Sequence, residues 1–318
     1  MRSDRVLVTG ATGFVGAWIL RRLREAHPEA EVWATSELPD PTGLGCAHYR
    51  RADLRNRDEV ATLVGGCRPS FVIHLASLIS GGSLEEYLAV NVIGTANLYR
   101  AVLEAAPAAR VLQIGSAAEY GLVRPDELPI TEEQPLRPVT EYALSKVAQE
   151  HLAVVVGMSR GLSIVRARIF NLVGPGQPDH LVPATFVRQL IAVRDGRADT
   201  LKVGDVSARR DFVDVRDAVD ALDTLLYRGE PGSVYNVGSG RDASVREIID
   251  ELMEISGVRP PVTVEATRMR PADVPVVRAH VSKMRDAFGW QTRISLPSSL
   301  AAMWTEAAAG AGNAEEGG

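Results

Sequence analysis

The chain has 318 residues with a formal net charge of −5, and 46% of its residues are hydrophobic. This length and apolar content suffice for one large or two closely joined domains, and the negative charge argues against a nucleic-acid partner. No run approaches the roughly 18 apolar residues of a membrane span, and neither the cysteines nor the histidines show metal-ligand spacing. We therefore expect a cytoplasmic protein that binds no metal, membrane or nucleic acid.

Strand-like apolar runs alternate with helical segments up to about residue 168. The runs lie near residues 5–9, 30–35, 48–51, 70–75, 110–115 and 162–169. Such alternation is typical of βαβ units, so the predicted fold is α/β, a doubly wound parallel (Rossmann) sheet with a smaller mixed α/β lobe after it. We expect the larger lobe to contain residues 1–169 and 207–240, the smaller lobe residues 170–206 and 241–306, and the small, acidic residues 307–318 to be disordered.

The first strand leads directly into the glycine-rich turn Thr9-Gly10-Ala11-Thr12-Gly13-Phe14-Val15-Gly16 and then into a helix. A turn of this kind lets the backbone approach a pyrophosphate and directs the N–H groups of the helix start toward it. The larger lobe is therefore predicted to bind a dinucleotide. The residues expected to contact it here are Gly10, Thr12, Gly13, Phe14, Val15 and Gly16.

The second strand ends in Thr35 and Ser36, where an acidic residue would bind the adenosine ribose 2′-hydroxyl. Small hydroxyl side chains remove the repulsion against a 2′-phosphate, which favours NADP(H). No arginine follows and Glu37 is adjacent, so NAD(H) remains possible.

The strand at 110–115 ends in Ser116, at the kind of strand end where open parallel sheets bind ligands. Only three lysines stand against 32 arginines, and Lys146 lies four residues after Tyr142. On a helix this spacing puts both side chains on one face. An ammonium lowers the pKa of a neighbouring phenol and can bind ribose hydroxyls. Each residue alone fits an ordinary turn or surface position, and the order of glycine turn, serine and Tyr-x-x-x-Lys pair predicts a catalytic site.

With these features the chain resembles the extended branch of the short-chain dehydrogenase/reductase superfamily, which acts on nucleotide sugars. Further matching motifs are Asp53-Leu54-Arg55, Val72-Ile73-His74-Leu75-Ala76, Asn91-Val92-Ile93-Gly94-Thr95 and Phe170-Asn171-Leu172-Val173-Gly174-Pro175-Gly176-Gln177. The later blocks are most similar to GDP-4-keto-6-deoxy-mannose reductases and GDP-mannose dehydratases: 203–205, 209–217, 234–237 and 268–275.

The resemblance implies a role for each matching residue. Tyr142 would be the general acid/base, Lys146 its pKa tuner and ribose anchor, and Ser116 the donor to the reacting oxygen. We expect Asn91 to brace the neighbouring helix and strand. Further cofactor contacts are assigned to Thr35, Ser36, Asp53, Leu54, Leu75 and Ala76, and substrate contacts to Asn171, Val203, Arg210 and Arg270. Helices near 84–106 and 141–158 are apolar on more than one face, and in this branch they pair across a dimer axis, so a homodimer is implied.

We therefore expect an oxidoreductase that reduces the 4-keto group of a nucleotide-diphosphate 4-keto-6-deoxy sugar with NAD(P)H, with a GDP-sugar favoured. The alternatives are a 4-epimerase or 4,6-dehydratase of the same fold, and a non-catalytic cofactor-binding regulator. A dehydratase needs an additional acid/base carboxyl, which similar dehydratases place at the position of Ala118. Glu119 is displaced by one residue, and we expect the turn to aim it away from the sugar.

Overall fold

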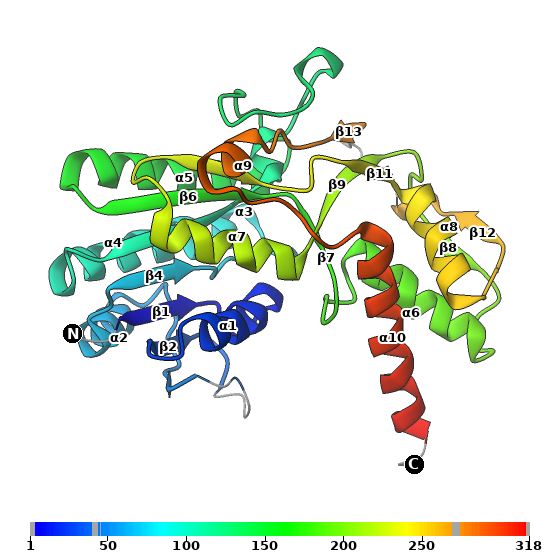
Figure 1. The fold of residues 1–318 in the computed structure, drawn as a ribbon, viewed down its shortest axis with the longest axis horizontal. Helices are drawn as coiled ribbons and strands as arrows, with labels where there is room; N and C mark the ends of the chain where they lie inside the picture. Colours follow the sequence, from blue (N-terminus) through cyan, green and yellow to red (C-terminus); the bar gives the residue numbers. More distant parts are fainter. Residues whose placement is uncertain (1–3, 40–43, 45, 269–273, 316–318) are drawn as a thin grey trace.

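The structure is a computed structural model that describes residues 4–39, 44, 46–268 and 274–315. A seven-stranded parallel sheet with the order β10-β6-β5-β4-β1-β2-β3 forms the centre of the larger lobe (Figure 1). Its strands in chain order are β1 (Arg5–Thr9), β2 (Glu31–Thr35), β3 (His48–Tyr49), β4 (Phe71–His74), β5 (Arg110–Ser116), β6 (Ser163–Ile169) and β10 (Val234–Val237). The predicted parallel Rossmann sheet and its six strands are confirmed.

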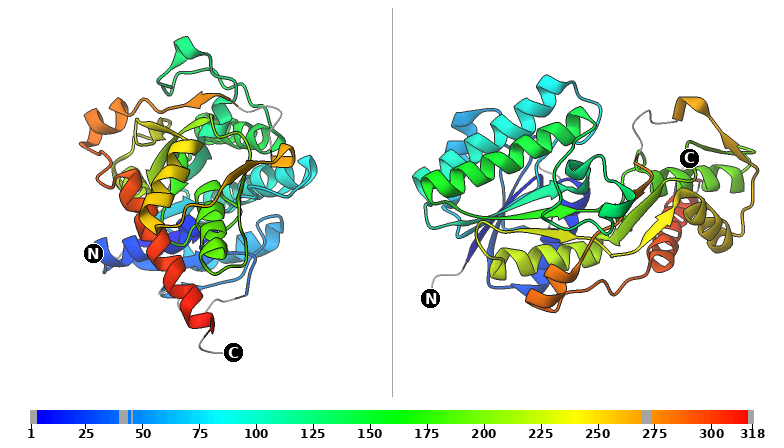
Figure 2. Two further views of the ribbon diagram at one scale, coloured as in Figure 1. Left: turned by 90° about the vertical axis from the view of Figure 1, so that its right-hand side faces the viewer. Right: turned by 90° about the horizontal axis from the view of Figure 1, so that it is seen from above.

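Helices cover both faces of this sheet, as Figure 2 shows from above. One face packs against α1 (Phe14–Ala26) and α7 (Val215–Arg228). The other packs against α2 (Arg57–Cys67), α4 (Gly94–Ala105) and α5 (Glu141–Arg160), with α3 (Leu84–Tyr87) and the π-helix η1 (Leu88–Ile93) leading into α4. Because both faces are covered, the strands are apolar along their length, and each face has its own buried core.

The smaller lobe has a separate apolar core. Strands β7 (Asn171–Val173), β9 (Arg209–Asp214), β11 (Asp242–Ser244) and β13 (Val276–Val277) form one sheet, and β8 (Leu201–Val203) pairs with β12 (Val262–Val264). Helices α6 (Val182–Arg194), α8 (Val245–Ser256) and α10 (Leu296–Glu315) pack around them (Figure 1). Short helices η2 (Ala117–Tyr120), η3 (Pro125–Glu127), η4 (Ala266–Arg268) and α9 (Ser282–Phe288) complete the described elements.

Three segments differ from the expected lobe boundaries. Strand β9 pairs within the smaller lobe, so the chain returns to the larger lobe at α7 and not at residue 207. The chain returns to the larger lobe a second time around α9, since Met284 and Trp290 lie in the same core of that lobe as Tyr235. Residues 307–315, predicted to be disordered, continue α10. Alanine is the best helix former, and five of residues 307–314 are alanine, so the local propensity outweighs the expectation from small, polar composition.

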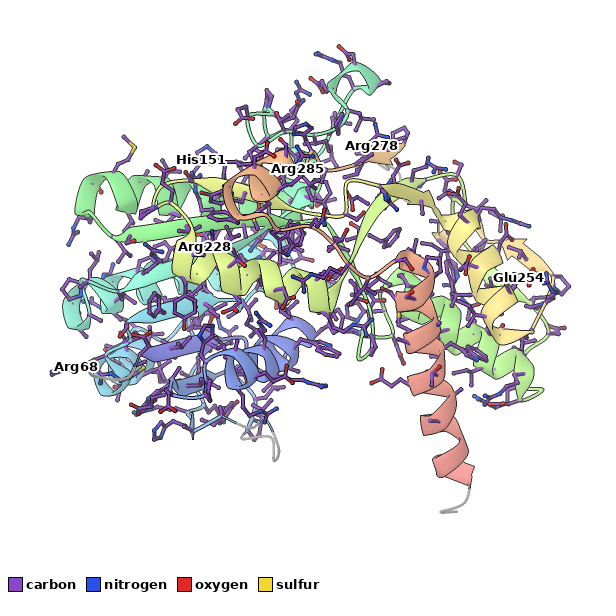
Figure 3. All side chains as sticks on the ribbon, viewed as in Figure 1. Arg68, His151, Arg228, Glu254, Arg278 and Arg285 are labelled. Carbon is purple, nitrogen blue, oxygen red and sulfur yellow. The ribbon has the colours of Figure 1, made fainter. Side chains whose placement is uncertain are left out.

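The order of the strands places a ligand site between β1 and β4. After β1 the chain adds β2 and β3 on one side and then crosses to β4, β5 and β6 on the other, which makes this junction the topological switch point. Strand β7 follows β6 after one residue and belongs to the smaller lobe, so the carboxyl ends of the strands face that lobe. Arg68 after α2 and Glu254 in α8 mark the two opposite ends of the molecule (Figure 3). Among the described residues no helix is long and apolar enough to cross a membrane.

Candidate active site

The glycine turn lies against the loop that follows β4. Gly10 has a φ of +69°, and a Cβ there would lie 2.7 Å from the backbone nitrogen of Ala76. A Cβ on Gly16 would lie 2.5 Å from the carbonyl oxygens of Gly10 and Ala11. The Thr9 hydroxyl accepts a hydrogen bond from the Ala76 N–H at 3.2 Å and joins the two strand ends. Glycine at these positions is therefore a steric requirement of the turn, and Leu75 and Ala76 form its opposite wall.

The start of α1 has the properties of an anion site. Its N-cap is Gly13, whose lack of a side chain leaves the first N–H groups without a side-chain cap, and the first turn contains no acidic residue. The first N–H groups of a helix have no intrahelical partner, and the helix dipole adds positive potential there. The backbone N–H groups of Phe14 and Val15 are therefore suited to bind a pyrophosphate, and the contact itself stays a prediction.

The end of β2, where the sequence predicts the adenosine contacts, has an arginine beside it that the sequence analysis did not identify. Residues after β3 run beside the end of β2, where the Ala52 N–H donates to the Ser36 carbonyl at 3.0 Å. This register brings Arg51 to Glu37, whose carbonyl accepts from Arg51 Nε at 2.8 Å. No arginine directly follows β2 in the sequence, so the local pattern does not indicate this neighbour. The pairing of β3 with β2, which the local sequence does not specify, is what brings it there.

The predicted adenosine contacts Thr35, Ser36, Asp53 and Leu54 lie at or beside this edge. Thr35 and Leu54 are buried, and the Ser36 hydroxyl shares a hydrogen bond of 2.7 Å with the Tyr49 hydroxyl. The Asp53 carboxylate accepts three hydrogen bonds of 2.8–3.0 Å from the Arg55 guanidinium, which lower the pKa of that carboxyl.

Helix α5 brings Tyr142 and Lys146 to the end of β5. The helix begins after Thr140, whose hydroxyl accepts from the Ala143 N–H at 3.1 Å, so Tyr142 lies in its first turn. Ser116 is the N-cap of η2, and its Oγ accepts from the Ala118 N–H at 3.2 Å. Ser116 is therefore both a capping residue and the polar neighbour of the Tyr142 hydroxyl. The structure brings the predicted trio together at the carboxyl edge of the sheet.

The Tyr142 phenol is held in its protonated form. Burial raises the pKa of Tyr142 to about 12, and the negative charge of Glu119 adds to the shift, whereas the hydrogen bond with the Ser116 side chain opposes it. We had expected Lys146 to lower this pKa. In the structure the Lys146 ammonium donates instead to the Ile114 carbonyl at 2.7 Å and to Gln149, so burial dominates at the phenol. A protonated phenol is the form that donates a proton.

Lys146 is connected to the glycine turn through buried polar side chains. Gln149 receives a hydrogen bond from Lys146 and donates one to the Thr95 hydroxyl at 2.8 Å. The His74 ring bonds Thr95 on one side and Thr9 on the other, both at 2.8 Å. Asn91 bonds Ser145 of α5 and the backbone of Leu78, in agreement with the expected bracing position. The lysine therefore belongs to a fixed network and is not a surface residue.

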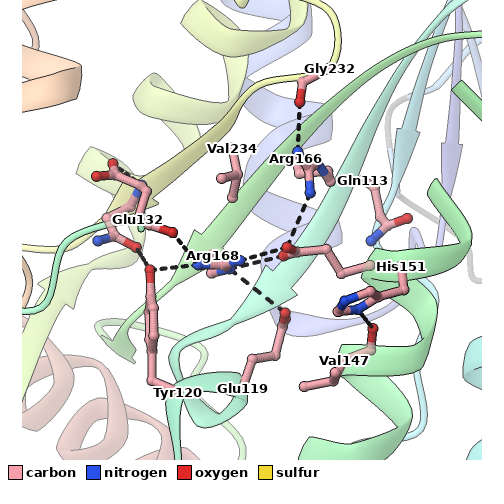
Figure 4. Close-up of polar contacts among 12 residues, drawn as sticks. Gln113, Glu119, Tyr120, Glu132, Val147, His151, Arg166, Arg168, Gly232 and Val234 are labelled. Atoms are coloured by element: carbon pink, nitrogen blue, oxygen red, sulfur yellow. Dashed lines mark hydrogen bonds and ion pairs between the residues drawn. The ribbon is translucent and has the colours of Figure 1, made fainter. Parts of the chain in front are cut away.

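Glu119 does not point toward a substrate. It is fully buried, and Oε1 accepts from the Ser116 backbone N–H at 2.6 Å. Oε2 lies 3.8 Å from Arg168 Nε, in a cluster that Arg168 and Glu150 form beneath the strand end (Figure 4). The carboxyl that a dehydratase requires is therefore not supplied by Glu119, and position 118 carries alanine.

The residues assigned to the substrate diphosphate are less closely grouped. Asn171 is exposed and begins β7, one residue after β6, and Arg210 on β9 donates from Nη1 to the carbonyls of Arg209 and Val274. Val203 is 1% exposed and packs in the core of the smaller lobe, so its side chain has a packing role that the prediction did not include. Arg270 lies outside the described residues.

Comparisons with known proteins agree with this geometry. The family model described as GDP-mannose 4,6 dehydratase matches residues 7–303. The chain is 35% identical to GDP-6-deoxy-D-mannose reductase of Pseudomonas aeruginosa, covering 96% of this chain and 97% of that one. The structure of RMD from P. aeruginosa complexed with NADPH superimposes with a TM-score of 0.83 at 35% identity, covering 96% of this chain and 98% of that one. The UDP-glucose 4-epimerase of Thermus thermophilus in complex with NAD also gives 0.83, at 30% identity and with coverage of 95% and 98%.

The fold and the glycine turn thus define a dinucleotide-dependent oxidoreductase of the short-chain dehydrogenase/reductase class. The chain belongs to the extended, nucleotide-sugar branch of that class, within the GDP-mannose 4,6 dehydratase family.

A substitution in the glycine turn tests the anion site. Gly16→Ala places a methyl group against two carbonyl oxygens, so we expect weaker NAD(P)H binding and a lower melting temperature. Gly65→Ala is the matched control, because Gly65 lies within α2 with no atom within 4 Å of the new methyl group. This control should retain cofactor binding and gain about 0.5–1 kcal/mol of stability. Fluorescence titration and thermal unfolding measure both effects, and unchanged binding in Gly16→Ala would contradict the assignment.

Proposed function

We propose that this protein reduces the 4-keto group of a nucleotide-diphosphate 4-keto-6-deoxy sugar with NAD(P)H, and that the nucleotide that carries the sugar is guanosine diphosphate. The observation that carries the proposal is the grouping of Ser116, Tyr142 and Lys146 beside the glycine turn, while the Glu119 carboxyl is held by the Ser116 backbone N–H. The similarity to the P. aeruginosa reductase over nearly the whole chain supports the choice of reaction and of guanine.

In this mechanism the bound nicotinamide supplies the hydride. The Tyr142 phenol, protonated at neutral pH, donates its proton to the oxygen of the former carbonyl. Because Ser116 Oγ already accepts the Ala118 N–H, its own O–H is available to donate to the same oxygen. Lys146 is proposed to bind the ribose hydroxyls, since a compact ammonium can satisfy several acceptors at once.

For the cofactor we propose a preference for NADP(H). Thr35 and Ser36 leave the end of β2 without a carboxylate, and Arg51 and Arg55 lie beside Glu37 at that edge. A guanidinium is well suited to bind a 2′-phosphate, and the similar P. aeruginosa structure was obtained with NADPH. Asp53 and Leu54, with Leu75 and Ala76 across the turn, complete the proposed adenosine and pyrophosphate contacts.

For the substrate we propose that Asn171, Arg210 and Arg270 bind the diphosphate. Asn171 lies on the carboxyl edge next to β6, and β9 carries Arg210 in the sheet that continues from that edge. Two phosphate charges need cationic partners, and guanidinium groups bind them in a bidentate manner. Val203 contributes by packing in the core of the smaller lobe.

A 4-epimerase is the second candidate because a similar structure is an epimerase with bound NAD. Its net reaction consumes no nicotinamide. A 4,6-dehydratase is disfavoured by Ala118 and by the buried Glu119, and a non-catalytic regulator is disfavoured by the assembled trio.

A direct assay separates these reactions. We expect NADPH to be consumed stoichiometrically with a GDP-4-keto-6-deoxy sugar, because each turnover transfers one hydride to the ketone. GDP-mannose should give no 4-keto product, and UDP-glucose should give no UDP-galactose. Absorbance at the nicotinamide band and mass spectrometry of the sugar nucleotides measure the outcome. Accumulation of a 4-keto product without net NADPH consumption would establish a dehydratase.

Replacement of the proposed proton donor is the second test. Tyr142→Phe should lower turnover by about 100- to 10,000-fold, as expected for loss of a general acid, and should leave NADPH binding nearly unchanged. Tyr87→Phe is the control, because its ring centroid lies 6.0 Å from that of Tyr142. The control should keep most of the activity. A Tyr142→Phe enzyme with more than a tenth of wild-type activity would refute the assignment.

We further propose a homodimer that forms through α5 and η1. Leu144, Val155 and Met158 on α5 are 46%, 58% and 85% exposed, and Ile93 on the adjacent η1 is 53% exposed. The three α5 residues lie on one helix face, since their spacings of 11 and 14 residues are close to whole turns. Apolar side chains gathered on one surface are typical of an interface.

This interface is tested by Val155→Glu and Met158→Glu, which put a charge on that face. Sedimentation velocity should show a dimer for the wild type and a monomer for both variants. Leu122→Glu alters a similarly exposed apolar residue outside α5 and should remain dimeric. A monomeric wild type would exclude the proposed dimer.

A further inference from the structure

Glu119 is a buried acid for which the reaction described above has no use. Its carboxyl group is fully buried, and the Ser116 N–H reaches Oε1 at 2.6 Å. No hydrogen-bond partner satisfies Oε2 within the described part of the chain. Burial of a carboxylate with an unsatisfied oxygen is costly, so a neutral residue would stabilise this position better if only packing mattered.

The end of β5 is built around this carboxyl. A Cβ on Gly115 would lie 2.6 Å from Oε1 of Glu119 and 3.5 Å from Cγ of Arg168. Gly115 therefore leaves the space that the carboxyl occupies. The Glu119 carboxyl accepts the backbone N–H of Ser116, and the Ser116 hydroxyl faces Tyr142. The carboxyl therefore fixes the backbone that carries this hydroxyl.

Glu119 and Lys146 hold the same strand end. Lys146 donates to the Ile114 carbonyl, and Glu119 accepts from the Ser116 N–H. Backbone groups two residues apart on a strand point to the same edge. Burial lowers the pKa of Lys146 and raises the pKa of Glu119, so both groups are driven toward their neutral forms. Against these shifts, Glu119 raises the pKa of Lys146 and Lys146 lowers the pKa of Glu119.

Every charged group near Glu119 contributes to this balance. Burial raises the pKa of Glu119, and Glu150 from α5 raises it further. From β6, Arg168 is largely satisfied by Glu150, at 2.9 and 2.5 Å, and by the Tyr120 hydroxyl at 2.9 Å (Figure 4). Arg166 also pairs with Glu150, at 3.1 Å. Arg168 Nε also lies 3.8 Å from Glu119 Oε2, so Arg168 and Lys146 are both cations near this carboxyl, and Arg168 is shared with Glu150.

We propose that Glu119 is a positioning residue for the reaction, which anchors the Ser116 backbone and, in its ionised form, serves as the buried counter-charge of Lys146. This inference rests on the proposed roles of Ser116 and Lys146. It gives the cluster beneath β5 a function in catalysis through these two residues, although Glu119 itself touches neither substrate nor cofactor.

The test is the pH dependence of NADPH binding and of kcat in Glu119→Gln, which keeps the size and the acceptor for the Ser116 N–H. Loss of the carboxylate lowers the pKa of Lys146, so the ammonium loses its proton at lower pH. It also lowers the pKa of Tyr142, whose donor form is then lost at lower pH. Both effects move the alkaline limb of activity in the same direction. We expect a displacement of about one pH unit toward lower pH, typical of a lost neighbouring charge, with the sugar-nucleotide KM changed less than twofold.

Glu132→Gln is the matched control. Glu132 is also a buried carboxylate, and it also accepts a backbone N–H, that of Asn236 at 2.8 Å. The alkaline limb of the pH–activity profile of Glu132→Gln should match that of the wild type. Gly115→Ala is a second variant, which keeps Glu119 ionisable but displaces its carboxyl, and it should shift the limb in the same direction as Glu119→Gln.

The outcomes separate this inference from the proposed function. A wild-type pH profile in Glu119→Gln, or an equal shift in Glu132→Gln, would show Glu119 to be a packing residue and overturn the inference. NADPH binding requires no sugar, so its pH profile can be measured even if the proposed substrate is not turned over. A wild type that binds NADPH but leaves the keto sugar unchanged would contradict the proposed function alone.

Discussion

The hydrogen bond from the Lys146 ammonium to the Ile114 carbonyl fixes helix α5 against the end of β5. Tyr142 lies one helical turn earlier on the same face, and Ser116 lies two residues further along the strand, so one bond sets the register of all three side chains. A buried ammonium is unfavourable unless acceptors surround it. Gln149 and the strand-end carbonyl meet this requirement, and the Glu119 carboxyl lies close enough to raise the pKa of Lys146 against the effect of burial.

The interior beneath this bond is unusually polar for the centre of a parallel sheet. His74, Thr95 and Gln149 link Lys146 to Thr9, and Arg168 with Glu150 fills the opposite side. Buried polar networks of this kind are stable only when almost every group finds a partner. The loop after β1, the start of α5 and the end of β5 are therefore held to one another by directional bonds as well as by apolar packing. A rigid arrangement is what a site needs in order to transfer a hydride and a proton to adjacent atoms.

The resemblance to dehydratases implies an acid/base carboxyl at position 118, one residue before Glu119. The carboxyl at position 119 enters the cluster beneath the strand end, and position 118 carries only a methyl group. A count of acidic residues near the strand end would not distinguish a carboxyl at position 118 from one at position 119. The backbone of η2 decides its direction, because successive residues of a tight helical turn point to different sides.

The sequence by itself determined the order of strands and helices, the dinucleotide turn and the Tyr142–Lys146 pair. These features follow from local rules: apolar periodicity, the steric demand for glycine, and the four-residue spacing on a helix. Only the tertiary structure decided what depends on contacts between distant segments. The pairing of β3 with β2 brings Arg51 to the adenosine edge, burial sets the pKa of Tyr142 in place of Lys146, and α9 returns to the first core. Residues 307–315 form a helix despite a composition typical of disorder. The charge cluster around Glu119 joins β5, α5 and β6, and no single segment of the sequence indicates it.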